Sequence, residues 1–198
     1  MEDCSAIVLA GGRASRLGGV NKARLEVGGR PLLERVLDSV TPLASQLLVV
    51  GHLAGDLPSS RAQVVPDLFP DGGSLGGIFT GLLHSKHDLA IVVGCDMPFL
   101  STDLLRLILA SSRGWDVTVP RIGPYQEALH AAYRRSCIPV FRDALASGRR
   151  RIVDCYAQVR LREIPEEELR RLDPELRSFL NVNTPEDLER ARKGQGDS

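Results

Sequence analysis

The chain has 198 residues, 43% of them hydrophobic, and its 25 basic residues balance 25 acidic ones. This length and apolar content suit one domain with a substantial core. A formal net charge of zero argues against a nucleic-acid binder, which usually carries a basic excess. No apolar run approaches the ~20 residues of a membrane-spanning helix, and the N-terminus lacks the basic start of a signal peptide, so we expect a cytoplasmic protein.

In the first half of the chain, strand-like and helical patterns alternate. Short apolar segments rich in Val, Ile and Leu predict strands at 5–10, 46–51, 62–66 and 88–94. Helical spacing predicts helices at 31–40, 75–85 and 102–110, the last preceded by Ser101 as an N-cap. Alternating strands and helices indicate a parallel sheet with right-handed crossovers.

The second half is less regular. It predicts strands at 116–120, 127–133 and 159–164, a turn at Gly123-Pro124, and helices at 135–146, 150–158 and 165–172. Thr184 and Pro185 are typical of the N-cap and first position of a final helix. We therefore expect an α/β fold: a Rossmann-like three-layer sandwich with a mostly parallel central sheet. Residues 1–193 form one domain in this interpretation, and 194–198 a polar tail.

The four cysteines are scattered along the chain and form no CxxC pair, and the four histidines are not spaced from them as zinc ligands would be. We expect reduced thiols rather than disulfides or zinc ligands. The GxSxG, GxxxxGK[ST] and GxGxxG patterns are also missing, so the sequence does not indicate a hydrolase elbow, a P-loop or a classical dinucleotide fingerprint.

The most informative segment follows the first strand. That strand stops at Gly11-Gly12, and Arg13, Arg16, further glycines and Lys22 come next. Glycines let a backbone approach a ligand closely, and successive N–H groups form an anion-binding concavity. The cationic side chains can neutralise a triphosphate, although loop arginines and lysines are often simply solvated. The pattern indicates a loop that binds the phosphates of a nucleotide.

Two acidic residues follow other predicted strands. Asp67 follows the third strand, and Asp96 follows the fourth, two residues before Pro98. Ligands of open parallel sheets bind beyond the carboxyl ends of the strands, so these residues should converge with the glycine-rich loop. Magnesium prefers one or two carboxylates plus phosphates and waters, so Asp96 is a candidate metal ligand. The alternative is an acid that caps the turn at Ser101 or faces solvent.

A second glycine-rich stretch, residues 71–77, leads into the second predicted helix. It would let a flat base lie against the backbone, and its alternative is a flexible connection.

At this point the motifs match a known family. LAGGRASRLGGVNK, CDMPFL and NVNTPEDL resemble the signatures of the molybdenum cofactor guanylyltransferases, the MobA family, within the glycosyltransferase-A-like nucleotidyltransferases. The resemblance spans nearly the whole chain, through residues 9–36, 64–67, 72–82, 95–100, 126–134, 148–152 and 179–188. It implies a fold of the nucleotide-diphospho-sugar transferase type.

The resemblance also implies an activity. Such enzymes transfer GMP from GTP to the phosphate of molybdopterin and release pyrophosphate, with Mg²⁺ as cofactor and no protein nucleophile. The roles that it implies are nucleotide contact for Leu9, Ala10 and Gly11, phosphate binding for Lys22, nucleoside binding for Asp67, metal binding for Asp96, catalytic-loop positions for Arg16 and Gly19, and acceptor binding for Asn181 and Asn183.

Three more glycines are candidate nucleotide contacts. Gly12 removes a methyl group beside the expected base, which favours the larger guanine. Gly77 belongs to the second glycine-rich stretch. Gly51 ends the second strand, where the family commonly has an asparagine, so only its backbone can contribute.

The two asparagines have a simpler alternative, a turn leading into the final capped helix. Their alternation across Val182 would instead place both amides on one side of an extended segment.

Three other functions stay open: a CTP-dependent cytidylyltransferase acting on the same pterin, a sugar-phosphate nucleotidyltransferase, and a non-catalytic nucleotide-binding regulatory module. Transient contact with molybdopterin-supplying proteins or apo-molybdoenzymes is compatible with the role.

Overall fold

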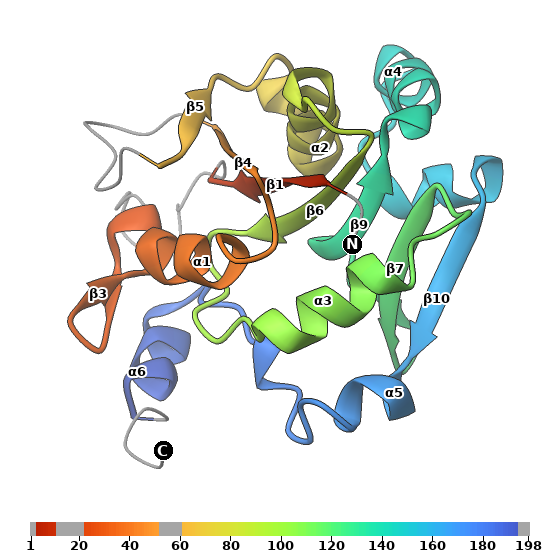
Figure 1. Cartoon of the computed structure of the whole chain (residues 1–198). Coiled ribbons are helices and arrows are strands. Elements are labelled where there is room, and N and C mark those ends of the chain that lie inside the picture. Colours follow the sequence, from red (N-terminus) through yellow and green to blue (C-terminus); the bar gives the residue numbers. More distant parts are fainter. Residues whose placement is uncertain (1–2, 11–21, 52–60, 194–198) are drawn as a thin grey trace.

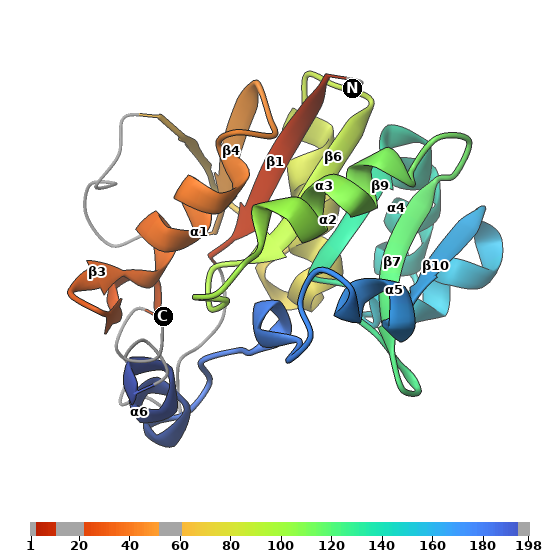
Figure 2. The same cartoon turned by 60° about the horizontal axis from the view of Figure 1, so that its bottom comes forward.

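The computed structural model of the chain describes residues 3–10, 22–51 and 61–193. Its centre is a twisted sheet in the order β10-β7-β9-β6-β1-β4-β5, with the short β8 added to β7 (Figures 1 and 2). The strands are β1 (Cys4–Leu9), β4 (Gln46–Val50), β5 (Gln63–Val65), β6 (Leu89–Gly94), β7 (Val117–Ile122), β8 (Tyr125–Gln126), β9 (His130–Arg134) and β10 (Leu161–Pro165).

The sheet is mostly parallel, as the sequence predicted. β1 runs parallel to β4 and β6, β4 to β5, and β7 to β10. Only β9, among these long strands, is antiparallel to its neighbours β6 and β7. The predicted strand at 127–133 was wrong at its start, because Glu127 accepts a hydrogen bond from the His130 N–H and closes a turn before β9 begins.

Helices cover both faces of the sheet and make three layers. One face carries α1 (Leu32–Val40), α3 (Thr102–Ala110) and α5 (Glu166–Arg170), and the other carries α2 (Gly73–His84) and α4 (Ile138–Ala146). Side chains of β1 alternate between the two cores: Ala6 and Val8 face α1, and Ile7 and Leu9 face α2. Burial on both faces explains why these strands read as continuous apolar runs.

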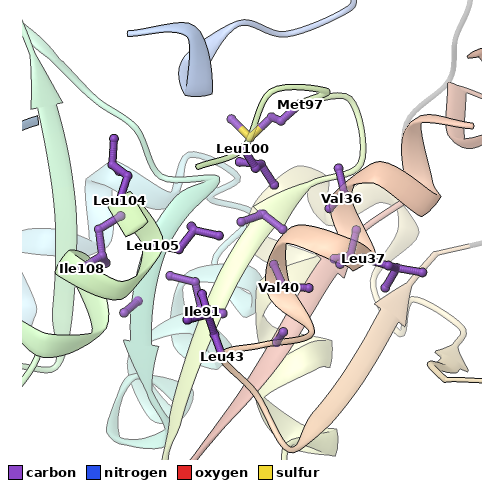
Figure 3. Close-up of a cluster of buried hydrophobic side chains, with 14 of the residues drawn as sticks. Val36, Leu37, Val40, Leu43, Ile91, Met97, Leu100, Leu104, Leu105 and Ile108 are labelled. Atoms are coloured by element: carbon purple, nitrogen blue, oxygen red, sulfur yellow. The ribbon is translucent and has the colours of Figure 1, made fainter. Parts of the chain in front are cut away.

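The core between the sheet and the first helical layer is shown in Figure 3. Leu37 and Val40 of α1 meet Leu105 and Ile108 of α3 around Ile91 of β6. The same cluster includes Val93 near the end of β6 and Met97 just beyond it, so this core also holds the carboxyl end of the strand.

Short 3-10 helices complete the described chain: η2 (Lys22–Arg24), η3 (Pro70–Gly72), η4 (Arg135–Cys137), η5 (Ile152–Gln158) and η6 (Arg177–Phe179). The predicted helix at 150–158 is therefore confirmed as a 3-10 helix rather than an α-helix. All four cysteines are buried, and none of them is in a disulfide within the described residues. None of the helices in the described residues has the length and apolarity needed to cross a membrane.

The second glycine-rich stretch is not the loop that the sequence predicted. α2 begins at Gly73, so most of the stretch is helical. The glycines serve close packing instead: a Cβ at Gly76 would lie 2.5 Å from the Phe69 carbonyl oxygen, and one at Gly81 would lie 2.5 Å from Ile7 Cγ2. Glycine on this helix lets it approach β1 more closely than any larger residue would permit.

Gly81→Ala should lower the free energy of unfolding by about 1–3 kcal/mol, because the new methyl group overlaps the buried Ile7 side chain. Urea denaturation followed by circular dichroism measures the change. The double variant with Ile7→Ala should lose less stability than the sum of the two single variants. An additive cycle would show that the overlap does not occur.

The C-terminus packs on a hairpin that the sequence analysis missed. β2 (Glu26–Val27) and β3 (Arg30–Pro31) are joined by Gly28 and Gly29, at φ of 61° and 71°. Two consecutive positive φ values fit a two-residue hairpin turn, which glycine permits. α6 (Pro185–Lys193) lies against this hairpin. Thr184 caps α6 as predicted, with its Oγ1 accepting a hydrogen bond from the Asp187 N–H at 3.1 Å.

Candidate functional site

The carboxyl ends of four strands meet at one edge of the sheet, as expected. The Ala10 N–H donates to the Val50 carbonyl at 2.8 Å, and the Cys95 N–H donates to the Leu9 carbonyl at 3.0 Å. The Gly51 N–H donates to the Val65 carbonyl at 3.0 Å. The predicted nucleotide contacts Leu9, Ala10 and Gly51 therefore lie side by side with the residues that precede Asp96 and Asp67.

The predicted phosphate-binding loop follows Ala10 and ends at Lys22, the first residue of η2. Five predicted positions, Gly11, Gly12, Arg13, Arg16 and Gly19, lie outside the described residues. Their roles stay predictions.

Asp96 lies directly beyond β6 and is partly buried. A Cβ at Gly94 would stand 2.7 Å from Asp96 Oδ1, so the carboxylate occupies space that only glycine leaves open. Its main-chain carbonyl accepts a hydrogen bond from the Val182 N–H at 2.8 Å. The alternative role, capping the turn at Ser101, is taken by Ser101 itself, whose hydroxyl accepts from the Leu104 N–H.

The residues at this edge fit a magnesium ion held together with a nucleotide. Within the described residues, no three His, Cys, Asp or Glu side chains gather as a metal cage. Asp96 offers a hard carboxylate next to the end of β1, from which the predicted phosphate loop starts. Magnesium is typically bound by one or two carboxylates while phosphate oxygens and waters complete its shell, so this arrangement suits it.

Asp67 lies beyond β5, at the opposite end of the same edge. Its Oδ1 accepts from the Phe69 N–H at 2.9 Å and from Thr80 Oγ1 at 3.0 Å. Thr80 is buried in α2, so this helix orients the Asp67 carboxylate. Sequence reasoning missed Thr80, because no local pattern signals a contact made across 13 residues.

Gly51 and Gly77 differ in what they offer a ligand. Gly51 has φ of 139°, a conformation that favours glycine, and lies at the edge itself. Gly77 is buried inside α2, where its Cβ would lie 3.1 Å from Leu9 Cδ2. It packs behind Leu9 in a helix rather than in an open loop, and its contact with a nucleotide stays a prediction.

The segment with the two predicted acceptor residues runs beside the end of β6. We call residues 177–183 the acceptor strap, after the role that is predicted for Asn181 and Asn183. Val182 is buried, while Asn181 and Asn183 on either side of it are exposed. Because the Val182 N–H is bonded to the Asp96 carbonyl, both asparagines lie within a residue of that contact.

A small satellite core ties the strap to the β2–β3 hairpin, which follows the predicted phosphate-binding loop. Val182 packs with Val27 of the hairpin and Leu188 of α6, and Phe99 lies against the same cluster. Arg35 of α1 reinforces the junction, since Nε donates to the Pro98 carbonyl at 3.1 Å and Nη1 to the Val27 carbonyl at 3.3 Å. The structure thus brings together the loop exit, the segment after Asp96 and the strap, which are far apart in sequence.

The start of the strap is held by groups that the sequence did not reveal. The Phe179 ring stacks on the fully buried His130 ring, with centroids 4.5 Å apart. Ser178 Oγ accepts from the Ser101 N–H at 3.1 Å, and the Asp173 carboxylate accepts from the Ser178 N–H at 2.7 Å.

Burial lowers the pKa of His130 from 6.5 to about 3, opposed by the nearby Asp173 carboxylate. The native protein therefore keeps this imidazole neutral, while the unfolded chain protonates it below about pH 6.5. Because the unfolded state binds more protons between these pKa values, stability falls as the pH drops through this window.

We expect wild-type protein to lose about 2 kcal/mol more stability than the His130→Phe variant between pH 7 and pH 5. Phenylalanine keeps the ring stack and does not titrate. Urea denaturation at a series of pH values measures the difference. Parallel profiles for the two proteins would contradict a neutral buried imidazole.

Comparison with known proteins agrees with this arrangement. The model of the MobA-like NTP transferase domain matches residues 6–163. The chain is 38% identical to "Molybdenum cofactor guanylyltransferase" of Desulfosudis oleivorans, covering 96% of this chain and 95% of that protein. It is 36% identical to "Probable molybdenum cofactor guanylyltransferase" of Pelotomaculum thermopropionicum, covering 97% and 93%.

A solved structure is similar over the full length. "Molybdopterin-guanine dinucleotide biosynthesis protein A" from Archaeoglobus fulgidus superposes with a TM-score of 0.82 at 32% identity, covering 98% of this chain and 100% of that chain. The fold match supports the three-layer architecture, and the family match covers the strands that form the site edge. The chain therefore belongs to the MobA-like NTP transferase family and is a nucleotidyltransferase.

Proposed function

We propose that this protein transfers GMP from GTP to the phosphate of molybdopterin, releases pyrophosphate and forms the guanine dinucleotide cofactor. One observation carries the proposal: the loop exit, Asp96 and the acceptor strap meet at one sheet edge, joined by the Val182–Asp96 hydrogen bond. The names of the full-length relatives, guanylyltransferases, support it.

In this reaction a phosphate oxygen of the acceptor attacks the α-phosphorus of GTP in line. The bond from that phosphorus to the bridging oxygen breaks, and pyrophosphate leaves with the electron pair. No covalent bond to the protein forms, so catalysis consists of positioning the two phosphates and neutralising their charge.

In this proposal the described residues bind the nucleoside at one end of the sheet edge and Mg²⁺ at the other. Asp67, oriented by Thr80, would hold the nucleoside, and Leu9, Ala10 and Gly51 would contact the nucleotide through the strand ends. Asp96 would hold Mg²⁺, which supplies positive charge to the phosphate oxygens when bound.

The remaining predicted residues complete the scheme. Arg16 and Lys22 would neutralise phosphate charge, Gly19 would shape the loop, and Gly11 and Gly12 would let the nucleotide approach the backbone. Asn181 and Asn183 would bind the acceptor from the strap. We further propose that residues 1–193 act as one catalytic domain in the cytoplasm, in transient contact with molybdopterin-supplying proteins or apo-molybdoenzymes.

The choice of nucleotide tests the proposal directly. Purified protein, Mg²⁺ and molybdopterin should form the dinucleotide with GTP and release equimolar pyrophosphate, and CTP should react more slowly. The margin should be modest, because one methyl group at position 12 discriminates by only ~1–3 kcal/mol. Faster reaction with CTP would make the protein a cytidylyltransferase. Binding of GTP without transfer would favour a regulatory module, and transfer to a hexose 1-phosphate a sugar-phosphate enzyme.

A further inference from the structure

A cavity of about 420 Å³ lies between the loop after Asp96, the acceptor strap and α6. Phe99 and Leu180 give it apolar walls, while Arg177, Asn181 and Arg190 bring polar groups to it. Two carboxylates, Glu175 and Asp187, also line it, and Asp187 pairs with Arg190 at 3.2 Å. A mostly apolar pocket with a few convergent polar groups is the usual make-up of a small-molecule site, and this volume falls in the usual range.

The cavity already contains a flat stack. The Arg177 guanidinium lies over the Phe99 ring, 4.9 Å from its centroid. A planar guanidinium can stack on a further aromatic ring while its N–H groups donate in the plane. Leu180 stands beside it with 54% of its surface exposed, which is unusual for a large apolar side chain next to a pocket.

One wall of the cavity is shared with the reaction edge. Val182 lines the cavity, and its N–H donates to the Asp96 carbonyl. Asn181 is both a lining residue and a predicted acceptor ligand. Asp67 follows β5, which lies three strands from β6, or about 14 Å at ordinary strand spacing. A molecule in the cavity would thus lie beside Asp96, whereas the proposed nucleoside end is three strands away from β6.

We propose that this cavity receives the flat, bicyclic, hydrogen-bonding ring of the acceptor, stacked with Arg177 and Phe99, with Asn181 and Arg190 at its polar edge. The inference rests on the proposed function, in which that ring is the pterin of molybdopterin. Guanine has the same type of hydrogen-bonding edge, so the experiment separates the two rings.

Three substitutions test the stack. Arg177→Gln and Phe99→Leu should weaken binding of 6-hydroxymethylpterin, followed by its own fluorescence, and raise the KM for molybdopterin, each by about tenfold. Arg177→Lys keeps the charge without the planar group and should recover only part of the loss. GTP affinity and kcat at saturating molybdopterin should stay at wild-type values.

Matched controls address charge and folding. Arg142→Gln removes an arginine whose side chain is 62% exposed on α4, on the other face of the sheet, and should behave as wild type. Arg190→Gln is a further test variant rather than a control. Its side chain is 78% exposed, so the change does not disturb the core, and it should raise the pterin Kd severalfold. Thermal unfolding confirms that each variant is folded.

Two results would overturn the inference: wild-type pterin affinity in both stack variants, or loss of GTP affinity rather than pterin affinity, which would assign the cavity to guanine. Failure of the proposed function looks different. If wild type transfers no GMP but binds the pterin through Arg177, the function fails and the cavity stands. If transfer proceeds with an unchanged molybdopterin KM in the stack variants, the cavity fails and the function stands.

Discussion

Replacing Asp96 with asparagine should lower GMP transfer by about 10³-fold while the protein stays folded. Asparagine has almost the same shape, so it fits the space that Gly94 leaves, and the Val182 N–H still reaches the main-chain carbonyl. What is lost is the negative charge that would hold Mg²⁺ against the phosphates. The variant should also need a higher Mg²⁺ concentration for its half-maximal rate.

Pyrophosphate release at saturating GTP and molybdopterin measures this effect, and urea denaturation checks the fold. Asp143→Asn is the matched control, because that side chain is 68% exposed on α4 and should give wild-type rates. Wild-type turnover in Asp96→Asn would remove Asp96 from the reaction and with it the metal role assigned to this residue.

Local sequence patterns predict most of the fold because the strands are buried on both faces. The segment predicted at 88–94 is β6 at Leu89–Gly94, and the segment predicted at 102–110 is α3 with its Ser101 cap. The prediction fails where tertiary contacts decide. β9 starts late because the turn at Glu127 uses residues that look strand-like, and the direction of β9 depends on its pairing with β6 and β7.

The role of each glycine likewise depends on tertiary contacts that the sequence does not show. Gly28-Gly29 forms a hairpin turn between two short strands, a pattern that sequence reading can find. Gly76 belongs to the stretch that was predicted as a glycine-rich loop, and Gly81 lies in the helix predicted after it, but the sequence does not show that Phe69 and Ile7 leave no room for a side chain at these positions. Composition alone does not separate a glycine needed for a turn from one needed for packing.

The candidate site, too, could be predicted only in part from the sequence. The loop glycines and Asp96 follow apolar strands, so topology predicts that they meet at one edge. The contacts that orient them are long-range: Thr80 to Asp67, Val182 to Asp96, and His130 to Phe179. These pairs carry no local signal, because each joins elements that only the folded sheet brings together.

Gly94→Ala tests whether the exact position of the Asp96 carboxylate matters for the reaction, because this variant keeps the carboxylate and displaces it. The new Cβ would lie 2.7 Å from Asp96 Oδ1, the flexible end of a side chain, whereas its next neighbours, Asp96 Cγ and Met97 Cγ, lie at 3.8 and 3.9 Å. The carboxylate can rotate away, so the fold should lose little stability. A displacement of about 1 Å at a reacting centre can lower the rate by about 10²-fold, and we expect a loss of that size in kcat.

Gly81→Ala provides the opposite outcome in the same protein. Its methyl group meets the buried Ile7 rather than a site residue, so stability should fall while kcat per folded molecule is retained. Measuring kcat and the free energy of unfolding for both variants gives two contrasting pairs of values. If Gly94→Ala keeps wild-type kcat, the precise placement of the Asp96 carboxylate is unimportant. If it unfolds the protein instead, Gly94 is a packing residue like Gly81, and the space beside Asp96 is not reserved for chemistry.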